Sequence, residues 1–170
     1  MARAGGDVAD DSSFEQFAAV TAARLYRTAW LLTGDAHAAE DLVQESLARV
    51  YVKWRDRTPI DNPVGYTRTV LLRQFISGRR RRSSTEVVTD RLPETGVVTD
   101  QASHIALRTA IAGMAPRDRA VLVLRYYADR TVAETAADLG MTESAVRTRT
   151  SRAVDKLRVL LGDDFLTTTN

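Results

Sequence analysis

The sequence TVAETAADLGMTESAVRTRTSRAVDK, residues 131–156, decides the fold. Thr131 and Glu134 have the spacing of a capping box, in which each side chain satisfies a backbone N–H of the other residue, and this predicts the start of a short helix. Gly140 then supplies a turn, and Thr142 is a suitable N-cap for a second helix. The order of helix, short glycine-containing turn and helix is typical of a helix-turn-helix, whose second helix enters the major groove of DNA.

The second of these helices has two contrasting faces. Placed at about 100° per residue, its mostly apolar side chains share one arc, which we expect to face the core. The members of this arc are Val146, Thr150, Ala153, Leu157, Leu160 and Leu161. The opposite arc carries basic and hydroxyl side chains, which fits a surface that lies against DNA, although a solvated basic face on a packed helix is the alternative. Its candidate base readers, in the first turns, are Ser144, Arg147, Thr148, Ser151 and Arg152. Its candidate phosphate ligands are Arg149, Lys156 and Arg158.

Helical periodicity extends through most of the remaining chain. The predicted helices have the approximate limits 13–33, 35–54, 63–82, 100–113 and 116 onward. Residues 83–99 lose this period and mix Ser, Thr, Pro and Gly with acidic residues, which is typical of a flexible linker, with two short strands as the alternative. We therefore predict an all-α chain of two small helical domains, an N-terminal bundle and a C-terminal helix-turn-helix, joined by a flexible linker. The predicted limits are 1–12 for a disordered N-terminus, 13–82 for the first domain, 83–103 for the linker, 104–162 for the second domain and 163–170 for a tail.

The composition excludes several kinds of function. The chain has no cysteine, so it has neither disulfides nor a thiolate site. Its two histidines, His37 and His104, fall in different predicted domains, and neither a metal site nor a catalytic triad can be assembled around one histidine. We expect no enzymatic activity, no cofactor and no metal. The chain also has no apolar run of the roughly 18 residues that span a bilayer, and we expect a cytoplasmic protein without membrane contact.

Charge is segregated along the sequence although the net charge is only +2. Basic residues gather at Arg79–Arg82 and again between Arg147 and Arg158, whereas acidic residues gather near the N-terminus and between the two basic groups. This distribution indicates a polyanionic partner that is contacted at two places.

Three stretches together resemble a known family. Residues 107–158 have the order helix, Pro-Arg-x-Arg, apolar run, tyrosine, helix-turn-helix and S-R-A-x-x-x-L-R. Residues 25–54, LYRTAWLLTGDAHAAEDLVQESLARVYVKW, and residues 62–82, NPVGYTRTVLLRQFISGRRRR, complete the pattern. The chain resembles the extracytoplasmic-function (ECF) sigma factors, bacterial transcription-initiation factors. By this resemblance, residues 13–82 are sigma region 2 and residues 104–162 are sigma region 4.

The resemblance implies two partners, core RNA polymerase and promoter DNA. Region 2 would bind the clamp helices of the polymerase β′ subunit through Asp41, Gln44, Glu45 and Arg49, region 4 would contact the β flap, and the protein would be nucleoid-associated. The helix-turn-helix would read the minus-35 element. The residues that match the minus-10 segment are Asp61, Asn62, Tyr66, Arg68, Arg73, Arg79 and Arg80. Asp61 and Asn62 stand in the loop that captures a flipped base, and Arg73 replaces an Asn that is frequent in the family.

The resemblance also sets the alternatives. Any anti-sigma factor would be a separate protein. A stand-alone helix-turn-helix regulator would share the C-terminal domain, but it needs a dimer to reach two half-sites, and the sequence shows no coiled-coil heptads for that purpose. Specific DNA binding only in the presence of polymerase distinguishes the initiation factor from such a regulator.

Overall fold

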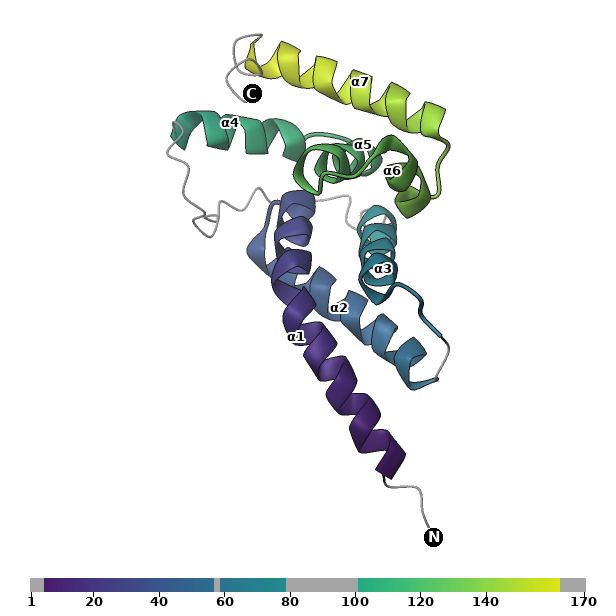
Figure 1. Cartoon of the computed structure of the whole chain (residues 1–170). Helices are drawn as coiled ribbons and strands as arrows, with labels where there is room; N and C mark the ends of the chain where they lie inside the picture. The colour runs from purple at the N-terminus through teal and green to yellow at the C-terminus, as the bar shows by residue number, and fades with distance from the viewer. Residues whose placement is uncertain (1–4, 57–58, 79–100, 163–170) are drawn as a thin grey trace.

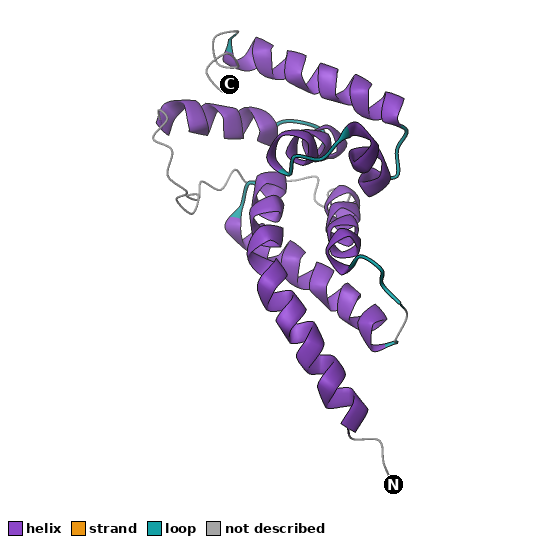
Figure 2. Ribbon diagram, in the orientation of Figure 1, coloured by secondary structure: helices purple, strands orange, loops and turns teal. Residues whose placement is uncertain are grey.

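The chain folds into helices throughout the part that the structure describes. This computed structural model describes residues 5–56, 59–78 and 101–162, and every regular element in these ranges is helical (Figures 1 and 2). The helices are α1 (Gly5–Thr33), α2 (Ala36–Arg55), α3 (Pro63–Gly78), α4 (Gln101–Ala112), α5 (Pro116–Leu122), η1 (Val123–Tyr127), α6 (Val132–Leu139) and α7 (Glu143–Leu161). The all-α prediction is confirmed, and the predicted linker lies outside the described residues except for 101–103, which begin α4.

Helices α1, α2 and α3 form the N-terminal bundle. The chain leaves α1 through Gly34, whose φ of +75° favours glycine, and Asp35 caps α2 by accepting a hydrogen bond from Ala38 N at 2.7 Å. A buried hydrogen bond of 2.8 Å from Ser46 Oγ to Gln74 Oε1 joins α2 to α3. These local signals were readable in the sequence, and the predicted starts of α2 and α3 are confirmed.

The start of α1 differs from the prediction. We expected disorder up to residue 12 and a capping box at Ser13, but α1 begins at Gly5. Once a helix is nucleated by packing further along, each additional residue adds a hydrogen bond at little cost, so it can extend beyond a local capping signal.

Helices α4 to α7 form the C-terminal bundle, which contains the predicted helix-turn-helix. Both parts of the capping box at Thr131 and Glu134 are present, Gly140 adopts the left-handed conformation with φ +61°, and Thr142 accepts from Ala145 N at 3.2 Å to cap α7. The predicted inward arc of α7 is correct at Val146, Ala153 and Leu157, which are buried. Leu160 is 55% exposed, so that part of the predicted arc was wrong. It lies on the last turn of α7, beyond the buried residues of the arc.

One segment of π-helix was not predicted. After α5, the wider turn η1 carries a hydrogen bond from Ala128 N to Val123 O at 2.9 Å. Asp129 then takes a positive φ of 50°, and Arg130 N donates to Leu124 O. Single-turn π segments of this kind are rare and are frequent at functional sites. Here it leads directly into the capping box at Thr131.

The two bundles share one hydrophobic core. Ala120, Val123 and Leu124 from the C-terminal bundle belong to the same buried cluster as the apolar side chains of α1, α2 and α3. Arg119 of α5 is only 1% exposed and donates to Leu32 O of α1 at 2.6 Å, which joins the two bundles. It also donates to Ala112 O at the end of α4, within its own bundle. Figure 1 shows the result, with α1–α3 on one side, α4–α6 against them and α7 outermost.

Candidate nucleic-acid interface

Helix α7 exposes the face that the sequence predicts to read DNA. Lys156 is exposed. All five candidate base readers are exposed as well, namely Ser144, Arg147, Thr148, Ser151 and Arg152. Arg147 forms a surface ion pair of 2.7 Å with Glu143, one turn earlier, which holds its guanidinium along the helix. Such an exposed pair is weak, so a base edge can compete for the guanidinium.

Arg149 is placed differently from the other basic residues of α7. Its guanidinium forms an ion pair of 2.6 Å with Asp118 of α5 and is only partly exposed. The pair ties the recognition helix to α5, which packs beneath it. In the structure Arg149 therefore orients α7, and a phosphate would have to compete with Asp118 for it.

A polar strip runs along α2, on the other bundle. Asp41, Gln44, Glu45 and Arg49 are all exposed, and Glu45 pairs with Arg49 at 3.0 Å across one turn. The members of the strip that sequence analysis carried over from the family thus share one accessible surface. Within the described residues no cluster of three or more His, Cys, Asp or Glu side chains is suited to a metal ion.

Sequence analysis missed a shallow apolar pocket beside the polar strip. It is lined by Phe14, Glu15, Leu47, Ala48 and Tyr51. The ring of Phe14 contacts those of Tyr51 and Trp54, with centroid separations of 5.0 and 5.6 Å. Only the packing of α1 on α2 creates this pocket, because its walls come from residues more than 30 positions apart, and no short sequence pattern signals it.

The predicted minus-10 residues fall into separate environments. Asp61, Asn62 and Arg73 are exposed, whereas Tyr66 is half-buried with Lys53 Nζ 4.3 Å from its ring centroid. Arg79 and Arg80 lie outside the described residues.

Asn62 caps the start of α3. Its side-chain oxygen accepts a hydrogen bond from Gly65 N at 2.8 Å. A Cβ atom at Gly65 would lie 2.7 Å from Asn62 Nδ2, so glycine at this position leaves room for the capping amide.

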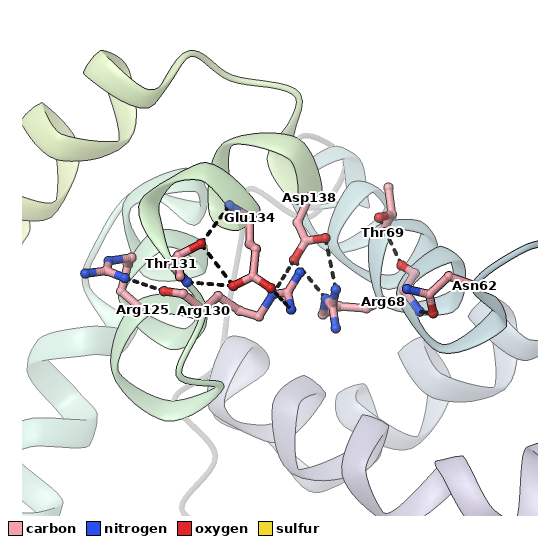
Figure 3. Close-up of polar contacts among 9 residues, drawn as sticks. Asn62, Arg68, Thr69, Arg125, Arg130, Thr131, Glu134 and Asp138 are labelled. Carbon is pink, nitrogen blue, oxygen red and sulfur yellow. Dashed lines mark hydrogen bonds and ion pairs between the residues drawn. The ribbon is translucent and has the colours of Figure 1, made fainter.

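Arg68 faces the C-terminal bundle and not solvent. Its Nε and Nη2 donate to the two carboxylate oxygens of Asp138 on α6, at 2.8 and 3.1 Å (Figure 3). Only 14% of the Arg68 side chain and 8% of the Asp138 side chain are exposed. Arg130 Nε joins the same carboxylate at 3.2 Å. We call Arg68, Arg130 and Asp138 the Asp138 cluster. No pattern in the sequence indicated that α3 and α6 meet here.

The Asp138 cluster continues into the capping box of α6. Arg130 also pairs with Glu134 at 2.6 Å, and Glu134 accepts from Thr131 N at 2.8 Å (Figure 3). The hydrogen bonds from the backbone and hydroxyl of Thr131, with the nearby charges of Arg130 and Arg68, hold the pKa of Glu134 below its ordinary value. Glu134 therefore stays ionised and fixes Arg130 against Asp138.

Comparison with known proteins assigns the chain to a family. Residues 19–85 match Sigma-70 region 2, and residues 110–159 match Sigma-70, region 4. The chain is 33% identical over 177 residues to the ECF RNA polymerase sigma factor SigL of Mycobacterium tuberculosis, covering 95% of this chain and 96% of SigL. The chain is an ECF RNA polymerase sigma factor. Region 2 of this sigma factor contains the polar strip of α2 and the start of α3, and region 4 contains the helix-turn-helix.

Further relatives agree with the assignment. This sigma factor is 34% identical over 148 residues to the RNA polymerase sigma-E factor of Streptomyces coelicolor, which covers 85% of this chain and 84% of the relative. Its fold is shared with the sigma factor RpoE, solved in complex with the anti-sigma factor NepR from Bartonella quintana. That match has a TM-score of 0.73 at 24% identity and covers 89% of this chain and 98% of RpoE. In the described ranges, no helix has the length and apolar character needed to cross a bilayer.

Proposed function

We propose that this sigma factor binds core RNA polymerase through the α2 strip and reads two promoter elements, the minus-35 element with α7 and the minus-10 element with the start of α3. The observation that supports this most is the placement of the strip and the α7 face. Both are exposed, and they lie on different bundles, so one enzyme–promoter complex can engage them together. Two weak DNA contacts held by one enzyme gain from the high effective concentration of the second.

In the minus-35 contact, the arginines of the first turns of α7 carry the specificity. Arg152 is exposed, and Arg147 leaves its surface pair with Glu143 to bind a base edge, since a guanidinium can bind guanine through two hydrogen bonds. Ser144, Thr148 and Ser151 supply hydroxyl contacts. Lys156 binds phosphate, and Arg149 contributes mainly by holding α7 on α5 unless a phosphate displaces Asp118.

In the minus-10 contact, the exposed Asp61 and Asn62 bind an unstacked base at the start of α3, with Tyr66 beside them as an aromatic surface. Arg73, Arg79 and Arg80 add positive charge for the DNA backbone. Arg68 belongs to this contact by its position in region 2, but it becomes accessible only when the Asp138 cluster separates.

The partners follow from the same assignment. Core polymerase would be bound through the β′ clamp helices and the β flap, and an anti-sigma factor, where one exists, is a separate protein, as NepR is for RpoE. Sigma factors are in general non-enzymatic initiation factors, and we propose that this one acts without a cofactor, in the bacterial cytoplasm at the nucleoid. Family membership disfavours the stand-alone regulator.

Run-off transcription from a randomised promoter library tests the proposal. Core polymerase with the wild-type protein should enrich two sequence elements at a fixed spacing, and the protein alone should bind neither tightly. Glu45→Arg should abolish complex formation with core polymerase because it reverses a charge in the strip. Asp56→Arg, an exposed charge reversal at the end of the same helix, is the control and should leave the complex intact. Failure of the wild-type protein to bind core polymerase would contradict the proposal.

A further inference from the structure

The ammonium of Lys53 lies beside the residues at the start of α3 that we assign to the minus-10 contact. Lys53 is on the last turn of α2, and its Nζ is 4.3 Å from the centroid of the Tyr66 ring on α3. Tyr66 follows Asn62 by one turn, because Tyr66 N donates to Asn62 O at 2.9 Å. The first turn of α3 therefore has a cation from a second helix next to it, and sequence analysis did not assign this cation to DNA.

The charge of Lys53 is not neutralised by a carboxylate, in contrast to two other cations of region 2. Arg49 pairs with Glu45, and Arg68 pairs with Asp138. Within the described ranges no carboxylate lies within ion-pair distance of the Lys53 ammonium, which contacts an aromatic ring instead. The ring attracts the cation through its quadrupole, but it takes away none of the positive charge. The N–H donors that point away from the ring also remain available for another acceptor.

A half-buried ammonium without a counter-ion is suited to a phosphate group. Lys53 and Tyr66 are both half-buried, so salt screens this charge less than it would screen a fully exposed one. An ammonium binds phosphate as a compact point charge, and the ring contact already orders the long side chain that carries it. A nucleotide whose base lies at Asn62 and Tyr66 brings its own phosphate into the same neighbourhood, because base, sugar and phosphate are covalently joined.

The alternative is a purely structural role for the charge. A cation in the last turn of a helix complements the helix dipole, and Lys53 and Arg55 both occupy the last turn of α2. Arg55 lies two positions further on, about 200° around the helix axis, and so it faces away from Tyr66. Arg55 thus shares the structural role but not the place beside α3, which makes it a matched control.

We propose that Lys53 binds the backbone phosphate of the nucleotide whose base is captured at Asn62, with the ring of Tyr66 holding the ammonium in place. This inference rests on the proposed function, because it requires the minus-10 element to lie at the start of α3. Phosphate contacts fix the register of a strand, and base contacts specify its sequence. Lys53 thus positions the strand, whatever its sequence, while Asn62 reads the base.

Nuclear magnetic resonance of the free protein tests the placement of the ammonium. The chain has only two lysines, Lys53 and Lys156, so isotope-labelled lysine gives one set of ε-methylene signals for each. The ring current of Tyr66 should move the ε-protons of Lys53 to lower chemical shift, whereas the exposed Lys156 should keep the shift of a free lysine. Tyr66→Leu should remove the difference. Equal shifts of the two lysines in the wild type would overturn the placement.

Binding of a forked promoter by the holoenzyme tests the phosphate contact. The DNA has a single-stranded minus-10 element with the sequence enriched from the promoter library, and one phosphate at a time is replaced by an uncharged methylphosphonate. At one position this replacement should weaken binding by the wild type at least about fivefold, and binding by Lys53→Met less than about twofold. Lys53→Arg keeps the positive charge and should restore the wild-type profile. Arg55→Met should also show the wild-type profile.

The outcomes separate the phosphate contact from the proposed function. The same methylphosphonate profile for the wild type and Lys53→Met would overturn the contact. An equal loss of affinity in Lys53→Met and Arg55→Met, at every substituted position, would show the structural role and would also overturn it. A wild-type holoenzyme that does not bind the forked promoter would refute the proposed function and the phosphate contact with it, while the chemical shifts would still decide the placement of the ammonium.

Discussion

Replacing Arg119 by methionine tests how much one buried guanidinium contributes to holding the molecule together. The side chain is 1% exposed and donates to Leu32 O at the end of α1 and to Ala112 O at the end of α4, and its charge lies near the ring of Phe75. Hydrogen bonds that involve a charged group contribute about 1.5–3 kcal/mol each, so these two bonds amount to about 3–6 kcal/mol. Methionine has similar length and no desolvation cost, which offsets part of the loss. We expect Arg119→Met to lower the free energy of unfolding by about 2–4 kcal/mol.

Urea unfolding measured by circular dichroism provides the assay for Arg119. Arg117→Met is the control, because Arg117 is an exposed arginine two positions earlier on the same helix and its replacement should change stability by less than about 0.5 kcal/mol. Since the bond to Leu32 O joins the two bundles, Arg119→Met should also divide a single transition into two. A loss below about 1 kcal/mol, or one equal to that of Arg117→Met, would refute the assigned role of the buried guanidinium.

Three further outcomes follow from the described contacts. Arg152→Ala should cost about 1–3 kcal/mol in binding a minus-35 duplex and relax the preference at one base pair, which fluorescence anisotropy on single-base variants of the site measures; an equal loss on every sequence would contradict base reading. Lys156→Ala should reduce the slope of log affinity against log salt concentration by about one. Arg149→Ala should reduce this slope by less, because Asp118 already neutralises the charge of Arg149. Equal slopes for the two variants would show that Arg149 binds a DNA phosphate. The pKa of Glu134 is lowered on folding, so the stabilisation by the Glu134 carboxylate is complete above the ordinary pKa of 4.5 and is lost as the pH falls below that value. Wild type and Glu134→Gln should therefore differ in melting temperature at about pH 7 and converge in acid. A difference that persists at about pH 2 would exclude ionisation of Glu134 as its cause.

Local signals predicted the parts of the fold that depend on neighbours in sequence. Asp35, Thr131 and Thr142 cap the helices that they were expected to cap, and Gly34 and Gly140 take the left-handed conformations that end helices. Each of these features needs only a side chain and a backbone group within three or four residues, so the sequence is sufficient to place it. The π-turn at η1 has no comparable local signature and was not foreseen.

Contacts between distant residues limited the prediction of the site. The exposed faces of α2 and α7 could be predicted because helical periodicity separates them from the core. The pairing of Arg68 with Asp138, 70 residues away, could not, because it depends on how two bundles with separate helical patterns pack together. The pairing of Arg149 with Asp118 could not be predicted for the same reason, because helical periodicity places Arg149 on α7 but says nothing of its neighbour on α5.

The amide of Asn62 is held in one direction by the first turn of α3. The same oxygen that accepts from Gly65 N at 2.8 Å is one of the two hydrogen-bonding groups that Asn62 can offer a nucleobase. The oxygen has a second lone pair and the amide nitrogen has two N–H groups, so the amide can offer both an acceptor and a donor while the bond to Gly65 N stays in place. The capping bond therefore sets the direction of the amide, and because a Cβ atom at Gly65 would lie 2.7 Å from Asn62 Nδ2, we expect Gly65→Ala to displace the amide and weaken the minus-10 contact that we propose for it.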